Sequence, residues 1–267
     1  MPYNPAANGT LRAWWCGDFG SASPPAATWY DESGYGNHLG WNGSKYSAYV
    51  STAGLVKHGT YSRHMFYWGL QKIGNAGLHS TFPGKNGTSN TTWTFCGWIR
   101  FHTTMYPSGT NATLFNKNWP GSMCYSLQVQ PANGFNAVFY TATPSSHTEK
   151  TTTVPDLNKW YHVGWAVSPT STLLRVWDDD AGAIFYSNGT TFASDPMRST
   201  DSEFVVARTA WVDEHVNAYC DDWQFHNIAM NEDEIDAIRM QLYPDPIRNI
   251  VSIPPIYARH YHKSNRA

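Results

Sequence analysis

Short aromatic motifs separated by turn-forming residues recur along this 267-residue chain, and they constrain the fold more than any other feature. Runs rich in Trp, Tyr, Phe, Val and Thr alternate with turns such as Asn133-Gly134 and Asn188-Gly189. Aromatic and β-branched residues favour strands, and regularly spaced short strands with turns between them indicate an all-β domain. The pattern therefore predicts an all-β, antiparallel sandwich of two sheets. The runs expected to form strands are 11–16, 92–101, 113–116, 125–130, 135–141, 160–167, 173–178, 184–187, 203–207 and 218–226.

One short helix is predicted after the last of these strands. Asn231 is placed to cap its first turn, and Glu234 stands three residues later, in the position of a capping box. Met230 and Ile235 have the spacing of a hydrophobic staple, and Pro244 cannot continue the helix. The expected apolar face of the helix consists of Ile235, Ile238 and Leu242.

The charge of the chain argues against two classes of partner. Charged residues make up 14% of the sequence and the formal net charge is −2, so the chain lacks the basic field that attracts nucleic acid or an anionic membrane. No apolar run approaches the roughly 20 residues of a membrane span. The amino terminus shows no secretory signal, because it has neither a basic nor an apolar region. We therefore expect no nucleic-acid and no membrane partner.

The composition changes near Pro244, which divides the chain into a domain of residues 1–243 and an extended C-terminal arm of residues 244–267. The arm has four prolines, no glycine, and four basic residues against one acidic residue. A proline-rich segment stays extended and cannot enter the interior of a sheet. Its apolar residues suit either an arm that docks on a partner or neighbouring subunit, or a strap across its own domain. The residues expected to dock are Ile253, Ile256, Tyr257, Arg259 and Tyr261.

The four cysteines lack the spacing of a metal site. Cys96 and Cys124 lie among strand-forming residues and are expected to be small buried hydrophobic residues. Cys16 and Cys220 lie in the first and last strands, which are often neighbours in a sandwich, so a disulfide between them is one alternative. The alternative that we favour is four reduced thiols.

Several motifs taken together resemble one known family. They are the turn Asp31–His38, the strand Trp93–Arg100, the element Leu114–Lys117, the hairpin formed by Trp160–Val163 and Leu173–Asp178, and the closing run Asp221-Asp222-Trp223 with its helix. In order and spacing they resemble the laminin G-like, concanavalin A-like family of lectins and glucanases. The resemblance covers about residues 11–242 and implies a jelly-roll sandwich. The run Asp178–Gly182 departs from the pattern, because the family usually has a shorter Asp-Gly turn there.

The resemblance implies a structural Ca²⁺ between the Asp31–His38 turn and the last strand. Asp31 and Asn37 from the turn, with Asp221 or Asp222 from the strand, would provide the oxygen ligands that Ca²⁺ prefers. The alternative is a glycine-rich turn in which the Asp31 carboxylate accepts hydrogen bonds from main-chain amides.

Glycan binding is indicated by aromatic residues in predicted loops. Sugar rings stack on flat aromatic faces, and the candidates are Trp41, Trp68, Trp119 and Trp211. Trp119 is expected to be the most exposed. Packing in the core is the alternative for these residues, and we expect it for Trp98 and Trp160.

Catalytic residues are not expected. Glycanases of the resembled fold carry a Glu-x-Asp-x-x-Glu strand that sets a nucleophile and an acid on one face. The nearest string, Glu234–Arg239, ends in Arg and lies in the predicted helix. The eleven histidines lack the spacing of a zinc site, and His162 is expected to be a hydrogen-bonded core residue. The run Asp178–Asp180 is expected at a solvated hairpin tip.

These observations favour a non-catalytic structural or binding protein displayed on a larger assembly. The expected type is a virion surface protein of a phage or virus, as a capsid decoration or tail-associated protein attached through the arm, with cell-surface glycan as a further partner. A homo-oligomer is compatible with this function, and the other expected location is extracellular or on a cell surface. The alternatives are a free Ca²⁺-assisted lectin domain and a divergent glycanase.

Overall fold

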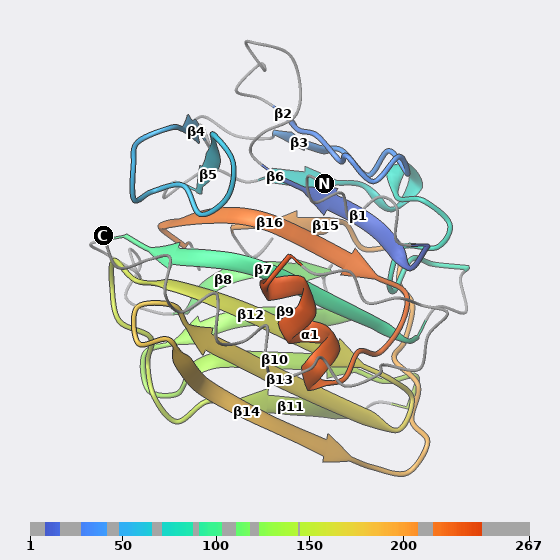
Figure 1. The fold of residues 1–267 in the computed structure, drawn as a ribbon. Coiled ribbons are helices and arrows are strands. Elements are labelled where there is room, and N and C mark those ends of the chain that lie inside the picture. The colour runs from blue at the N-terminus through green and yellow to red at the C-terminus, as the bar shows by residue number, and fades with distance from the viewer. Residues whose placement is uncertain are drawn as a thin grey trace.

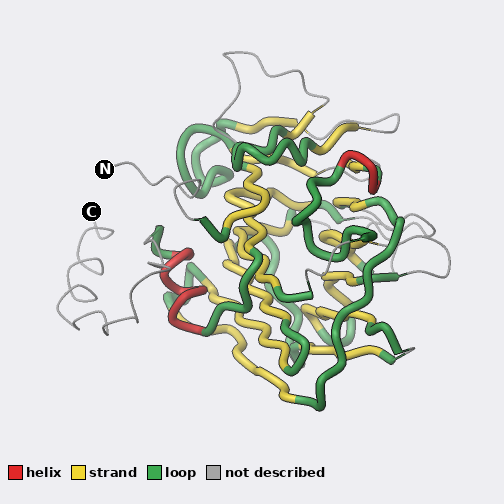
Figure 2. The backbone as a smooth tube through the Cα atoms, turned by 90° about the vertical axis from the view of Figure 1, so that its right-hand side faces the viewer, coloured by secondary structure: helices red, strands yellow, loops and turns green. Residues whose placement is uncertain are grey.

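The computed structural model describes residues 9–16, 28–41, 48–65, 71–87, 91–102, 111–117, 123–143, 145–207 and 216–241, with the main chain alone at 41, 48 and 71. Its strands form two antiparallel sheets packed face to face (Figure 1; Figure 2). The predicted two-sheet jelly-roll sandwich is therefore confirmed. The arm of residues 244–267 lies outside the described residues.

One sheet, which we call the β7 sheet, contains eight strands. Seven follow the order β14-β13-β12-β7-β16-β5-β4, and β1 pairs with the second half of β16. The first and last strands are thus neighbours, as expected. The strands are β14 (Ala183–Thr191), β13 (Ser171–Asp178), β12 (Trp160–Val167), β7 (Trp93–Phe101), β16 (Ala218–His226), β5 (Ser62–Met65), β4 (Ala48–Val50) and β1 (Leu11–Trp15).

The other sheet, the β9 sheet, also has eight strands, in the order β11-β10-β9-β8-β15-β6-β3-β2. A single turn of 3-10 helix, η2 (Asn75–Gly77), follows β6. The strands are β11 (Ser146–Lys150), β10 (Gly134–Tyr140), β9 (Tyr125–Gln130), β8 (Ala112–Lys117), β15 (Phe204–Val206), β6 (Gln71–Ile73), β3 (Leu39–Trp41) and β2 (Thr28–Trp29).

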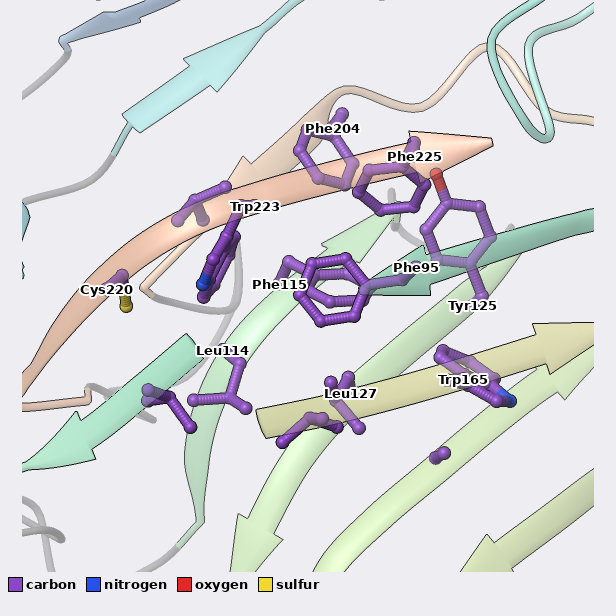
Figure 3. Close-up of a cluster of buried hydrophobic side chains, with 14 of the residues drawn as sticks. Phe95, Leu114, Phe115, Tyr125, Leu127, Trp165, Phe204, Cys220, Trp223 and Phe225 are labelled. Atoms are coloured by element: carbon purple, nitrogen blue, oxygen red, sulfur yellow. The ribbon is translucent and has the colours of Figure 1, made fainter. Parts of the chain in front are cut away.

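Aromatic side chains from both sheets fill the space between them (Figure 3). Phe95 of the β7 sheet lies 4.6 Å, ring centre to ring centre, from Phe115 of the β9 sheet. Phe115 in turn lies 5.8 Å from Trp223. Tilted and edge-to-face contacts of this kind add to the burial of large apolar surface. This core therefore accounts for most of the phenylalanines, eight of twelve, but for only five of the thirteen tryptophans.

Helix α1 (Glu232–Arg239) lies on the outer face of the β7 sheet (Figure 1). The predicted capping box is present: the Asn231 side chain accepts from the Glu234 amide, and the Glu234 carboxylate accepts from the Asn231 amide. Met230 and Ile235 share one apolar cluster, as the predicted staple requires. The helix ends at Arg239, before Pro244. Leu242, which was expected on its apolar face, lies outside the described residues.

A second aromatic cluster covers another part of the same outer face. Trp98, Trp160 and Tyr219 are buried there, beneath the segment 51–61. Their neighbour His162 is also buried on this face, and burial lowers its pKa well below the usual range. The prediction that Trp98 and Trp160 are packed is confirmed. They pack in this smaller cluster and not between the two sheets, because alternate residues of β7 and β12 point outward.

All four cysteines are reduced and buried. Cys220 contributes to the main core, where its thiol lies beside the Met65 sulfur, whereas Cys16 packs in a separate cluster with Leu11 and Trp14. The favoured alternative of four thiols therefore holds, and the alternative disulfide does not form in this structure.

Candidate functional site

The outer face of the β9 sheet carries polar side chains in its middle. On β9, Tyr125, Leu127 and Val129 point into the core, so Ser126 and Gln128 point outward. The same alternation directs other polar side chains to this face. They are Thr113 and Asn116 on β8, and Asn136 on β10.

The strand register aligns these outward side chains in two rows. In one row the neighbours across the strands are Thr113, Gln128, Asn136 and Lys150. In the other they are Val205, Asn116, Ser126, Val138 and Thr148. Side chains directly opposite each other on paired strands are about 5 Å apart. The register therefore places hydrogen-bonding side chains of several strands side by side.

Exposure decreases along both rows from β11 toward β8. Thr148 and Lys150 on β11 are exposed, whereas Gln128 and Asn136 are each only 8% exposed. Thr113 on β8 is completely buried. The face is therefore exposed at β11, whereas the outward side chains of β8 and β9, which we call the floor of the face, are covered.

Ser126 lies on this floor with an unused hydroxyl group. Its side chain is buried, and within the part of the chain that the structure describes its Oγ has no hydrogen-bond partner. A buried hydroxyl without a partner costs about 1–3 kcal/mol. Because this atom is buried, a ligand could contact it only by displacing the part of the chain that covers it.

Tyr140 provides an aromatic ring at the end of the same face. Phe139 points into the core, so Tyr140 points outward, opposite Ser146 of β11. The Arg198 guanidinium carbon lies 5.3 Å from the centre of the Tyr140 ring. This pair offers a flat surface and a hydrogen-bond donor beside the polar rows. The alternation of Phe135, Ala137 and Phe139 is the sequence signal that could have identified Tyr140.

The middle of this face is an uncharged hydrogen-bonding surface, with the cations Lys150 and Arg198 at its edges. Asn, Gln, Ser and Thr side chains donate and accept hydrogen bonds without carrying charge. Among its described side chains, the carboxylate of Glu203 accepts from Lys72 Nζ at 2.8 Å, which neutralises it. Glycoside hydrolysis usually needs two carboxyl groups roughly 5–9.5 Å apart. The described part of the face therefore offers hydrogen bonds and stacking rather than a pair of acids.

Most of the loop tryptophans that were predicted to bind glycan are not among the described residues. Trp68, Trp119 and Trp211 lie outside the described residues. Trp41 ends β3 and so belongs to the β9 sheet, but its side chain is not described. Glycan binding by these four residues remains a prediction. The docking residues of the arm, Ile253 to Tyr261, likewise lie outside the described residues.

Asp31 is buried in the turn where calcium was expected. Its Oδ1 accepts hydrogen bonds from the main-chain amides of Trp14 and Ser33, each at 2.9 Å. Its Oδ2 accepts from the Asn37 amide at 2.7 Å. The Asn37 side-chain oxygen accepts from the His79 amide at 2.8 Å. These contacts are those of the alternative, in which N–H groups surround the carboxylate.

The two carboxylates of the last strand make different contacts. Asp221 Oδ2 accepts from the amides of Lys57 and His58, each at 3.0 Å. Asp222 Oδ1 accepts from the Trp14 indole at 2.6 Å. No group of three or more His, Cys, Asp or Glu side chains within the described ranges is arranged to hold a metal ion. The N–H groups around these carboxylates do not fit the expected calcium centre.

Two further polar groups have structural roles. Asp178 is buried and accepts from the Ala181 amide, and Asp179 pairs with Lys57 of the segment 51–61, so of the run expected to be solvated only Asp180 is exposed. Ser145 and His147 both donate toward Asp195, at 2.9 and 3.3 Å. In a nucleophilic triad the imidazole lies between the hydroxyl and the carboxylate. Here both groups contact the carboxylate instead, so this arrangement is not a triad.

No helix in the described part of the chain is long and apolar enough to cross a membrane. No curated protein sequence matches the chain. Several solved structures share its fold at low sequence identity, and they are domains of larger proteins.

The receptor binding domain of botulinum neurotoxin mosaic serotype C/D has a TM-score of 0.58 at 13% identity, over 86% of this chain and 50% of that one. The binding domain of Paraclostridial Mosquitocidal Protein 1 has a TM-score of 0.60 at 12% identity, over 86% of this chain and 51% of that one. The chain thus spans about half the length of these two binding domains.

Domain 4 of AbnA matches over nearly its whole length. AbnA is a GH43 extracellular arabinanase from Geobacillus stearothermophilus, and its domain was solved in complex with arabinotriose. The TM-score is 0.58 at 14% identity, over 85% of this chain and 96% of that one. The model of the concanavalin A-like lectin/glucanases superfamily matches residues 74–236. This range includes β7 to β16 and most of α1, and the chain therefore belongs to the concanavalin A-like lectin/glucanases superfamily.

Proposed function

We propose that this chain is a non-catalytic carbohydrate-binding domain that holds a neutral glycan on the outer face of the β9 sheet. The observation that carries the proposal is the floor formed by β8 and β9, where amide and hydroxyl side chains are buried and the Ser126 hydroxyl is unpaired. A glycan has many hydroxyl groups that both donate and accept, so it matches such a surface better than an apolar or charged ligand does.

The similar structures support this class of function. They include receptor-binding domains of toxins and an arabinanase domain in complex with arabinotriose. Their identities of 13% and 14% leave the ligand of this chain to be argued from its own residues. Under this proposal the ligand enters at β11, where the side chains are exposed, contacts Gln128 and Asn136, and stacks on Tyr140.

Display on a larger assembly is the second part of the proposal. Its support is the apolar and basic composition of residues 244–267, which follow directly on the closing helix. Under this proposal the arm attaches the domain to a virion or another protein assembly, and the β9 sheet faces the glycan. Loss of particle attachment when residues 244–267 are deleted would support it, and retained attachment would contradict it.

The class of function is tested by two assays on the full chain. Screening on a glycan array is expected to give binding to neutral oligosaccharides, with no strict dependence on added Ca²⁺. Incubation with a panel of polysaccharides is expected to release no reducing sugar. Release that disappears when one carboxylate is replaced by its amide would show a glycanase and contradict the proposal. An array without binding to any neutral glycan would contradict it as well.

A further inference from the structure

Lys117, the last residue of β8, places an amine where a charge is costly. Its side chain is fully buried, and within the described part of the chain no carboxylate forms an ion pair with it. Its Nζ donates to the main-chain carbonyls of Thr200 and Ser202, at 2.8 and 2.6 Å. Burial lowers the pKa of this amine to about 8, so a larger share of it than usual is uncharged near neutral pH.

The two carbonyls match the two N–H groups of an uncharged amine. The lone pair of its nitrogen is then left for the third neighbour of Nζ, the side-chain amide of Asn75 in η2. Nζ lies 3.3 Å from Asn75 Oδ1, so the amide carbon, one C=O bond further, is within about 4.5 Å of it. Reacting atoms in a near-attack arrangement are about 3–3.5 Å apart, so a displacement of roughly 1 Å brings this nucleophile onto the amide carbon.

The oxygen of the Asn75 amide has a second donor. The main-chain N–H of Asn86 donates to Asn75 Oδ1 at 3.3 Å. When a nucleophile attacks an amide carbon, negative charge develops on the amide oxygen, and a donor in this position stabilises it, as in an oxyanion hole. Because both donors lie on the oxygen side, the amide nitrogen of Asn75 faces the other way.

Asp201 lies on that nitrogen side. Its Oδ1 is 3.5 Å from Asn75 Nδ2, and it also accepts from Asn86 Nδ2 at 2.5 Å, which holds the carboxyl group in place. A carboxyl group between an attacking amine and a leaving nitrogen can take a proton from the first and give it to the second. Asp201 is exposed, so a small leaving molecule such as ammonia has a route to solvent.

We propose that Lys117 and Asn75 form an intramolecular isopeptide bond, with Asp201 as the proton-transfer group. A C–N bond forms between Lys117 Nζ and Asn75 Cγ, and the bond from Cγ to Nδ2 breaks. One proton passes from Nζ to Nδ2 through the Asp201 carboxyl group, ammonia leaves, and nothing is oxidised or reduced. The bond joins η2 to β8 and, like a disulfide, restricts the separation of two distant parts of the chain. This inference is independent of the proposed glycan face.

Mass spectrometry of the full chain tests the bond. Loss of ammonia makes the wild type about 17 Da lighter than its sequence. Because other asparagines can also lose ammonia, digestion with trypsin identifies the bond itself. Lys117 is then no longer a cleavage site, and residues 73–85 and 101–150 should appear as one branched peptide. Separate peptides 73–85, 101–117 and 118–150, as expected if Lys117 only donates hydrogen bonds, would overturn the proposal at any intact mass.

Two pairs of variants test the role of each group. Lys117→Met removes the nucleophile and should restore the full intact mass. Its control is Lys85→Met, because Lys85 donates to the nearby Leu78 carbonyl, and this variant should remain about 17 Da light. A light mass in Lys117→Met, or the full mass in folded Lys85→Met, would contradict the bond.

Asp201→Asn removes the proton-transfer group at an exposed position, where the fold should tolerate it. We expect the branched fraction of freshly purified protein to fall at least ~10-fold. Glu203→Gln is the matched control, because the Glu203 carboxylate pairs with Lys72 instead, and its branched fraction should equal that of the wild type. Equal branched fractions in Asp201→Asn and the wild type would overturn the role of Asp201, and melting curves identify the variants that are folded.

Discussion

The ammonium group of Lys57 lies 4.2 Å from the centre of the Trp98 ring, and the same group pairs with Asp179. The main-chain amides of Lys57 and His58 also donate to Asp221. Together these contacts fix the segment 51–61 over the outer face of the β7 sheet. They explain why this aromatic face is covered, whereas the β9 sheet presents polar side chains.

Loss of the Lys57 charge is expected to weaken this cover. Lys57→Met keeps most of the apolar stem but removes the cation from Trp98 and Asp179. We expect the free energy of unfolding, measured in urea, to fall by about 1 kcal/mol. Lys159→Met is the control, because Lys159 pairs with the exposed Asp156. A fall no larger than in this control would contradict the assigned role of Lys57.

The free energy of unfolding is expected to fall as the pH drops below the pKa of an unperturbed histidine. Burial, reinforced by the charge of Lys57, lowers the pKa of His58 to about 4, and burial lowers that of His226 to about 3. In the unfolded chain a histidine titrates near ~6.5, so between these values the unfolded state binds more protons. The stability that each neutral buried histidine contributes is therefore complete above pH ~6.5. It is lost as the pH falls toward about 4 for His58 and about 3 for His226.

Urea unfolding at about pH 7 and about pH 5 checks this dependence, and each histidine is expected to contribute on the order of 1 kcal/mol to the difference. His58→Gln and His226→Gln remove the titrating group and should each reduce the difference. An equal pH dependence in the wild type and both variants would show that other groups are responsible.

The Asp31 carboxylate is expected to stabilise its turn without a metal ion. Since three main-chain amides donate to it, Asp31→Ala should leave buried donors unpaired and lower stability by about 2–4 kcal/mol. Chelator and millimolar Ca²⁺ should leave the melting temperature of the wild type unchanged. A rise of the melting temperature that saturates with Ca²⁺ would instead establish the calcium site implied by the family resemblance.

The approach of α1 to the β7 sheet depends on Gly164. A Cβ atom at this position would collide with the Ile235 side chain. Gly164→Ala is therefore expected to cost about 1–3 kcal/mol in the free energy of unfolding. Because Ile235→Ala removes the colliding atoms, the double variant should lose less free energy of unfolding than the sum of the two single losses. Additive losses in the double variant would contradict this explanation.

The long strands of the centre were predictable from the sequence. β9, β12 and β16 have the expected boundaries, because aromatic and β-branched runs define them and turn residues end them. The capping box and the apolar face likewise identified α1. The short strands β2 to β6 were not predicted, because runs of two to four residues carry little periodicity. β11 was missed because Ser146–Lys150 is polar, and its pairing with β10 decides its conformation.

The candidate site was less predictable than the fold. The sequence pointed to aromatic residues in loops, whereas the structure brings together side chains from separate strands. Ser126, Gln128 and Asn136 are ordinary polar residues in the sequence, and only the register of β8, β9 and β10 places them side by side. Strand alternation could have assigned each to the outer face. The order of the strands, which depends on long-range packing, could not have been read from the chain.

Glycan binding by the outer face of the β9 sheet is tested most directly by titrating a glycan selected on the array against the wild-type protein and Asn136→Ala. Loss of one or two hydrogen bonds to a neutral ligand should weaken binding about 3–30-fold. Tyr140→Ala should weaken it as well, and Tyr61→Ala is the matched control because Tyr61 is exposed elsewhere on the domain. We expect weaker binding in the first two variants and unchanged binding in the third. Unchanged affinity in Asn136→Ala and Tyr140→Ala, with the fold intact, would contradict it.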